Sequence, residues 1–236
     1  MSGPQTLTRP LATRIAGLPE ILERTDTPMI PEAVIDAALE ALKAGRTHYT
    51  DRPGILGLRK WVSEHLQQLN IASKPDDVTI TCGATEARFV IIKRLLSKDD
   101  TILCPGDPTL IEGAAHLTDT KIIHDLDQQH RVKLLYITPR DAPDIVEPLL
   151  AQAEQQGWWI LWDMSSGQAK QFHPSQKAVL APRVVSVGSF SDVMPGWRVG
   201  WMAGSEMADK LRAYKQSLTI CTTSISQWAG IGIAET

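Results

Sequence analysis

Apolar residues recur at helical spacing in the first part of the chain. The segment 31–45 begins with Pro31, repeats apolar positions every three or four residues and ends at Gly45. These features predict a helix, since proline suits a first turn and glycine a helix end. A second amphipathic helix is predicted over 58–69.

From residue 78 onward, the pattern changes to short apolar runs of strand length. We predict strands over 78–82, 101–104, 121–125, 132–138, 158–163, 184–190 and 198–204. We predict further helices over 84–96, 109–117, 145–156 and 205–218, the last of them capped by Ser205. Nearly continuous apolar strands that alternate with helices predict an α/β fold, a mainly parallel sheet with helices on both faces. Residues 1–48 are interpreted as an N-terminal arm and helix, and 49–236 as the sheet domain.

Composition and charge limit the classes of protein to which the chain is expected to belong. The chain is 43% hydrophobic and 22% charged with a net charge of -3, which is ordinary for a globular protein and disfavours nucleic-acid binding. No apolar run reaches membrane-spanning length and the N-terminus lacks a signal-peptide pattern, so we expect a soluble cytoplasmic protein without membrane contact. The three cysteines form no CxxC pair, which argues against a disulfide framework and a metal site.

Polar residues follow several of the predicted strands. In parallel sheets, ligands bind beyond the carboxyl ends of the strands. Gly83, Ala84 and Thr85 precede a predicted helix, while Ser189 and Arg198 flank the end of a later strand. Free helix N–H groups, hydroxyls and an arginine together form a phosphate cup. Each feature alone is weak evidence, because Gly-Ala-Thr before a helix is usually only a turn and cap, Ser189 is compatible with capping a strand, and Arg198 with a surface ion pair.

Asp163 closes the apolar run WWILWD at 158–163. A carboxylate at that position is expected to be partly buried and to need a cationic or hydrogen-bonding partner. A protonated pyridine nitrogen is one such partner.

Several motifs occur in one order along the chain. They are GLPE at 17–20, HYTDRPGILGLRKWV at 48–62, CGATEA at 82–87, ILCPGDPTLIEGAAHL at 102–117, WWILWD at 158–163, PGWRVGW at 195–201 and LTICTTSISQWA at 218–229. With these motifs, the sequence resembles the class I/II aminotransferases, pyridoxal-phosphate (PLP) enzymes of fold type I. The resemblance implies the large domain of that fold and PLP or pyridoxamine phosphate (PMP) as cofactor.

The resemblance also implies roles for individual residues. Gly83, Ala84 and Thr85 would hold the cofactor phosphate, and Ser189 and Arg198 would complete that cup.

Three further positions match motifs nearer the cofactor ring and the subunit interface. Asp163 would pair with the pyridine N–H, and Leu110 stands where the family has a ring-stacking aromatic. Tyr49 would reach the phosphate of a neighbouring subunit, which implies a homodimer or a heterodimer with a similar chain.

The largest departure from the family is Asp192, which stands where the motif has the lysine that forms the Schiff base. A carboxylate cannot form an imine with the cofactor aldehyde. The asparagine motif is replaced by TPRDAP at 138–143, and the C-terminal small domain is missing from the sequence. We expect its loss to expose apolar surface around 225–234.

These departures favour an aminotransferase-like protein that binds PLP or PMP non-covalently without ordinary transaminase activity, as a pseudoenzyme or a partner subunit. Three alternatives remain. One is an enzyme with lysine-independent chemistry, in which Asp192 acts as a base or Lys170 replaces the missing amine. The second is an aminotransferase completed by a separate chain that acts on a small amino compound, and the third is an inactive remnant.

Overall fold

A single mixed sheet organises the protein. The computed structural model describes residues 29–126, 129–167 and 173–234, and within them seven strands are ordered β1-β7-β6-β5-β4-β2-β3. The strands are β1 Val78–Thr81, β2 Asp100–Leu103, β3 Lys121–Ile123, β4 Arg131–Ile137, β5 Trp159–Asp163, β6 Val184–Ser189 and β7 Gly200–Ala203. Strands β6, β5, β4, β2 and β3 are mutually parallel, and β7 is antiparallel to both β1 and β6. The predicted mainly parallel α/β sheet is confirmed.

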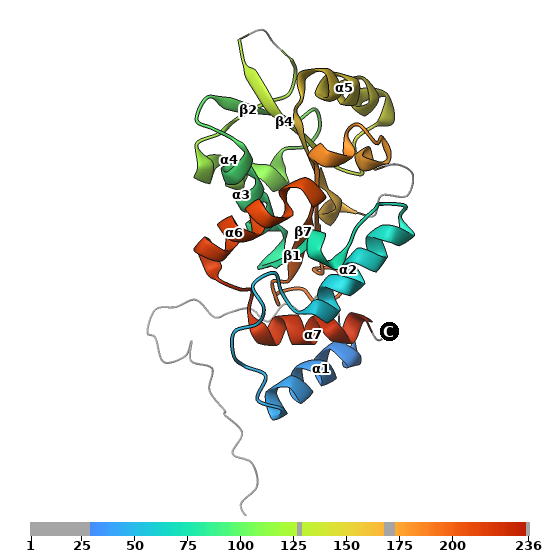
Figure 1. Ribbon diagram of the computed structural model, residues 1–236, viewed down its shortest axis with the longest axis vertical. Helices are drawn as coiled ribbons and strands as arrows, with labels where there is room; N and C mark the ends of the chain where they lie inside the picture. The colour runs from blue at the N-terminus through green and yellow to red at the C-terminus, as the bar shows by residue number, and fades with distance from the viewer. Residues whose placement is uncertain (1–28, 127–128, 168–172, 235–236) are drawn as a thin grey trace, which may run out of the picture.

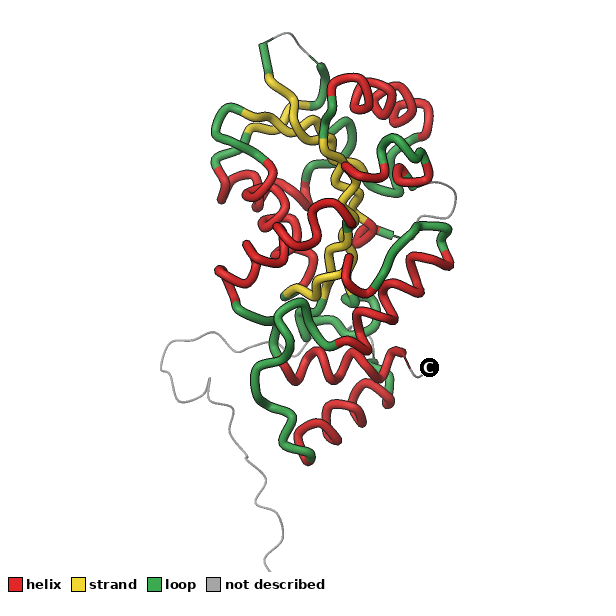
Figure 2. Tube along the Cα trace, viewed as in Figure 1, coloured by secondary structure: helices red, strands yellow, loops and turns green. Residues whose placement is uncertain are grey.

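Helices cover both faces of the sheet (Figures 1 and 2). They are α1 Glu32–Lys43, α2 Leu56–Gln68, α3 Gly83–Leu95, α4 Thr109–Thr118, α5 Pro143–Gln156, α6 Ala208–Thr219 and α7 Ser224–Ala234. No helix in the described part of the chain is long and apolar enough to cross a membrane.

The strand residues alternate between two buried clusters. One cluster joins Leu161 of β5 to residues of α3, α4 and α6, and the other joins Trp162 to residues of α2 and α5. Alternate residues of a strand point to opposite faces. Asp163 therefore lies on the same face of the sheet as Leu161, the face that α3 covers.

The start of α6 differs from the prediction. Ser205 does not cap this helix; it begins a short 3-10 turn, Ser205–Met207, and the N-cap of α6 is Met207. The side chain of Met207 is buried, so the chain turns to bury it before the α-helix begins at Ala208.

The C-terminal segment also differs from the prediction. Residues 225–233 do not form an exposed apolar surface, because they belong to α7, which packs against α1 and α2. The approach to α1 is close at Gly232, where an added Cβ would lie 2.2 Å from the Ala33 carbonyl oxygen. A backbone oxygen at that distance cannot yield without moving α1.

Replacing Gly232 with alanine should therefore destabilise the protein. We expect Gly232→Ala to lower the free energy of unfolding by about 1–3 kcal/mol, the usual cost of forcing a methyl into a filled contact. Urea unfolding followed by circular dichroism measures this quantity.

The matched control is Gly113→Ala in α4, where an added Cβ meets nothing within 4 Å. Both changes carry the same gain in helix propensity, about 1 kcal/mol. Gly113→Ala should be neutral or stabilising, and equal effects of the two substitutions would contradict the close α1–α7 contact.

Candidate functional site

The carboxylate of Asp163 lies at the carboxyl end of β5, in the middle of the sheet. It is fully buried, where the sequence predicted partial burial. Both of its oxygens accept hydrogen bonds: Oδ2 from Arg88 Nε at 2.6 Å and Tyr136 Oη at 2.9 Å, and Oδ1 from the Ser165 N–H at 3.0 Å and the Ser165 hydroxyl at 2.7 Å. The predicted need for a cationic or hydrogen-bonding partner is met by the protein itself.

Arg88 supplies the positive charge. It stands on α3, its guanidinium also donates to the Ser165 hydroxyl, and its side chain is 6% exposed. An ion pair this deeply buried is stabilising only when the remaining polar atoms are bonded, and Tyr136 and Ser165 meet that need. The three residues together hold Asp163 as a compensated carboxylate.

Sequence reasoning did not identify Arg88, Tyr136 or Ser165. Arg88 is buried on α3 at helical spacing from Ala84, Ile91 and Ile92, which are buried and apolar. An arginine at helical spacing among apolar residues predicts a buried charge that needs an acid. That signal was present in the sequence.

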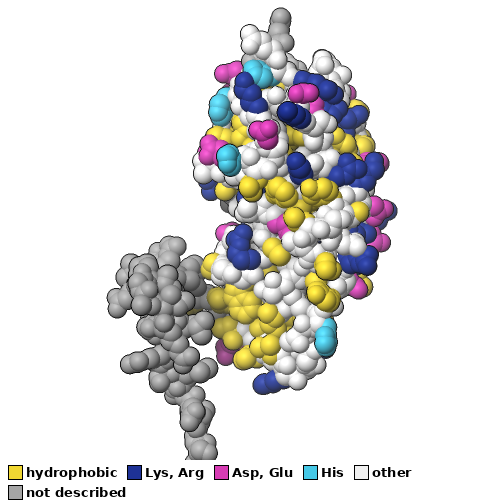
Figure 3. Space-filling view, turned by 90° about the vertical axis from the view of Figure 1, so that its left-hand side faces the viewer, with side chains coloured by type: hydrophobic (Ala, Val, Ile, Leu, Met, Phe, Trp, Pro, Cys, Tyr) yellow, Lys and Arg dark blue, Asp and Glu magenta, His cyan; other side chains and the backbone are white. Residues whose placement is uncertain are grey.

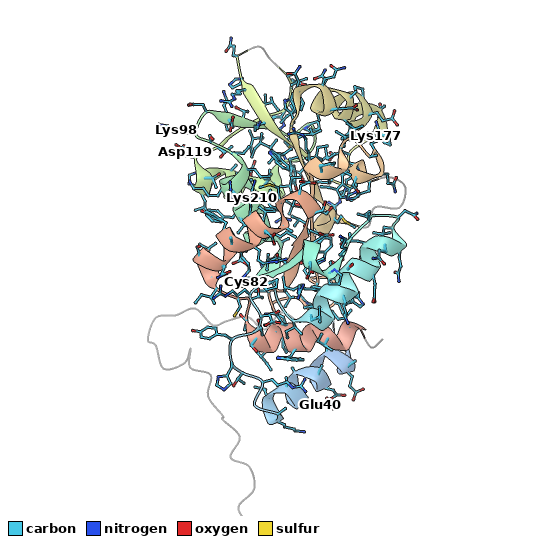
Figure 4. The ribbon with its side chains drawn as sticks, in the orientation of Figure 1. Glu40, Cys82, Lys98, Asp119, Lys177 and Lys210 are labelled. Atoms are coloured by element: carbon cyan, nitrogen blue, oxygen red, sulfur yellow. The ribbon has the colours of Figure 1, made fainter. Side chains whose placement is uncertain are left out.

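The N-terminus of α3 forms the second part of the site. Gly83 has φ +78° and no side chain caps the helix, so its first N–H groups have no side-chain acceptor. Cys82, labelled in Figure 4, is the residue at the N-cap position. The Arg198 guanidinium lies over Gly83, where an added Cβ would be 2.5 Å from Nη2. The arginine and the helix end therefore present positive potential to the same place.

A tight backbone contact brings the end of β6 to this helix end. Gly200 pairs with Ser189 across β7 and β6, and an added Cβ on Gly200 would lie 2.7 Å from the Ala84 nitrogen. The structure thus brings Gly83, Ala84, Ser189 and Arg198 together. Thr85 is exposed in the first turn of α3.

Glu86 is an acid beside this cationic site. One of its oxygens accepts the Cys82 N–H at 2.7 Å and lies 3.8 Å from Lys215 Nζ, while the other accepts the Thr219 hydroxyl at 2.8 Å. Lys215 is fully buried. Because its ammonium compensates Glu86, this carboxylate does not cancel the positive potential at the helix end.

Asp192 lies on the turn that follows β6. The turn is anchored by Phe190 and Met194, which are buried and joined by a 2.8 Å backbone hydrogen bond. Asp192 itself is exposed. Ser189 accepts the Ser191 N–H at 3.1 Å, which leaves the Ser189 hydroxyl proton available to donate to a ligand.

The exposure and element of two other predicted residues are known. Leu110 is in the first turn of α4 and 40% exposed, and Tyr49 is in the loop between α1 and α2 and 82% exposed. Lys170 lies outside the described residues.

Comparisons with known proteins agree on one family. A probable aspartate aminotransferase of Methanocaldococcus jannaschii is 26% identical over 239 residues, covering 85% of this chain and 62% of that protein. An (S)-3,5-dihydroxyphenylglycine transaminase of Amycolatopsis orientalis is 32% identical over 198 residues, covering 67% of this chain and 45% of the relative. The chain thus spans about half to two thirds of the length of these relatives. No family model matches it.

Solved structures give the same result for the fold. The aspartate aminotransferase of Rhizobium meliloti superposes with a TM-score of 0.75 at 24% identity, covering 88% of this chain and 60% of that chain. A double mutant of the Thermus thermophilus aspartate aminotransferase gives 0.70 at 22% identity, with coverage of 86% and 61%. The homologues and structural neighbours of the chain are thus class I aminotransferases of PLP fold type I, which agrees with the resemblance that its motifs carry. Aminotransferases of this class depend on PLP, which supports the prediction of PLP or PMP as cofactor.

The two ends of the site fit such a cofactor differently. At the phosphate end, an uncapped helix N-terminus, the Ser189 hydroxyl and Arg198 match the donors that a phosphate needs. At the ring end, Asp163 already accepts four hydrogen bonds, about as many as a carboxylate has lone pairs to offer. A pyridine N–H would have to displace one of these donors.

Tyr136 gives a pH-dependent test of this arrangement. Burial and the neighbouring Asp163 charge raise the pKa of its phenol above the ordinary value of 10.0. The neutral phenol therefore contributes stability that is complete below pH 10.0 and is lost as the pH rises, because the unfolded tyrosine ionises first.

Tyr136→Phe should lower the free energy of unfolding by about 1–2 kcal/mol at pH 8, since Asp163 loses a donor. The difference between the two proteins should shrink above pH 10.0. Urea unfolding at several pH values measures it, and a difference that grows with pH would contradict the buried phenol–carboxylate bond.

Proposed function

We propose that this chain binds PLP or PMP non-covalently through the phosphate and does not catalyse ordinary transamination. The observation that carries the proposal is the exposed Asp192 at the position of the family's lysine. A carboxylate forms no covalent link to an aldehyde, and it supplies no amine to move protons between carbon atoms. The chain acts as a cofactor-binding pseudoenzyme or as the partner subunit of an active aminotransferase.

The cluster at the start of α3 supports phosphate binding. Arg198 and Ser189 converge on an uncapped helix end, and Lys215 compensates the nearby Glu86. A charged phosphate is stabilised there by the helix dipole and by charge-assisted hydrogen bonds.

The loop that carries Tyr49 supports association with a second chain. Tyr49 is 82% exposed, and Ile220, at the end of α6, is 50% exposed. Figure 3 shows apolar side chains gathered on the lower part of the face turned to the viewer. An exposed apolar area of this kind is typical of an interface, and in a homodimer or heterodimer Tyr49 would reach the phosphate of the neighbouring site.

Arg198→Leu tests the phosphate cup. Removing a charged donor should weaken PMP binding by about 10- to 100-fold, the equivalent of a charge-assisted hydrogen bond. Isothermal titration with PMP measures the affinity, and PMP is used because it lacks the aldehyde that reacts with surface lysines. Arg94→Leu, an exposed arginine on the same helix, is the matched control and should leave the affinity unchanged. An equal loss in both variants would indicate non-specific electrostatic attraction.

Asp192→Lys tests the absence of covalent chemistry. After incubation with PLP and reduction with borohydride, intact mass and peptide mapping should show a stoichiometric adduct at position 192 of this variant, and only substoichiometric modification of surface lysines on the wild-type protein. Asp192→Asn is the control and should resemble the wild-type protein, with no stoichiometric adduct. A stoichiometric adduct on the wild-type chain, mapped to Lys170 or another lysine, would instead favour the enzyme hypothesis.

A further inference from the structure

The ring end of the site contains a positive charge that belongs to the protein. Arg88 Nε lies 2.6 Å from Asp163 Oδ2, and the exposed fractions of the two side chains are 6% and 0%. An arginine keeps its proton at every pH at which a protein is folded. The carboxylate is therefore compensated permanently, whether or not a ligand is present.

We propose that Arg88 takes the part of the pyridine N–H at Asp163, so that a cofactor in this site is held by its phosphate alone. The inference rests on the proposed phosphate binding and adds that the pyridine ring makes no charged contact with Asp163. A pyridinium at Asp163 would place a second cation on one carboxylate, beside the guanidinium. The ring nitrogen consequently stays unprotonated, and the protein gains little affinity from the ring.

The surroundings of Arg88 reinforce this arrangement. Its guanidinium also bonds the Ser165 hydroxyl, which itself donates to Asp163 Oδ1. Tyr136 donates to Oδ2 from the neighbouring strand β4. A ligand that displaced Arg88 from Asp163 would leave a guanidinium that is only 6% exposed without its acid, which is strongly unfavourable.

Weak discrimination between phosphate esters is the measurable consequence. A protein that uses only the phosphate should bind PMP and a plain phosphate monoester with similar affinity. A protein in which Asp163 is available should prefer PMP, because its ring nitrogen then gains a charge-assisted hydrogen bond.

The experiment titrates PMP and methyl phosphate into the full chain and three variants by calorimetry. We expect the two affinities of the wild-type protein to differ by less than about threefold. Arg88→Leu frees Asp163 and should raise the preference for PMP at least about tenfold, the gain from one charge-assisted hydrogen bond. Arg88→Leu with Asp163→Asn should lose that gain, and Arg94→Leu should resemble the wild-type protein.

The outcomes separate this inference from the proposed function. If the wild-type protein binds neither ligand, the proposed function fails, and the inference that the phosphate alone holds the cofactor fails with it. If the wild-type protein binds both ligands and Arg88→Leu gains no preference, the inference fails and the proposed function holds. If no protein binds either ligand, both are wrong.

A second variant covers the case in which Arg88→Leu does not fold. Asp163→Asn alone leaves Arg88 in place and removes the acid that a pyridine N–H would need. Loss of PMP affinity by tenfold or more, with methyl phosphate unaffected, would overturn the inference, since Asp163 would then be serving the ring. Parallel changes in the two affinities support it.

Discussion

The ion pair between Arg88 and Asp163 fixes one helix against the end of a central strand. A carboxylate with no exposure is costly unless it is paired and fully bonded, and here the pairing cation comes from α3. The same helix supplies the N–H groups at the phosphate end of the site. One buried interaction therefore sets the position of α3 relative to β5, and with it the distance between the two ends of the site.

The two ends of the site differ in whether their polar groups are available to a ligand. The phosphate end remains open to a ligand, because the helix start is uncapped and the acid beside it is compensated by Lys215. At the ring end, Asp163 is not available to a positively charged ligand group, because Arg88 already pairs with its carboxylate. In the function proposed above, this division and the aspartate at the lysine position allow the chain to hold a phosphorylated compound without transforming it.

Much of the fold could be predicted because continuous apolar runs encode buried strands directly. The antiparallel direction of β7 could not be predicted, since apolar periodicity carries no information about strand direction. The burial of Asp163 followed from its place after WWILW. Its partner was missed because arginine is usually a surface residue, although the helical spacing of Arg88 with Ile91 indicated a buried face. The packing of α7 was missed because its partner α1 is remote in sequence.

The contact between α1 and α7 also has a consequence for how the chain acquires its structure. Almost the whole described sequence separates these two helices, yet they pack closely enough to require glycine at position 232. During synthesis, α1 emerges long before α7 exists, so its apolar face stays unpartnered while the sheet forms. Contacts between such distant segments slow folding and leave intermediates prone to aggregation. We accordingly expect α1 to dock onto α7 late in folding, and among the described helices α1 is the one for which a chaperone has the longest opportunity to act.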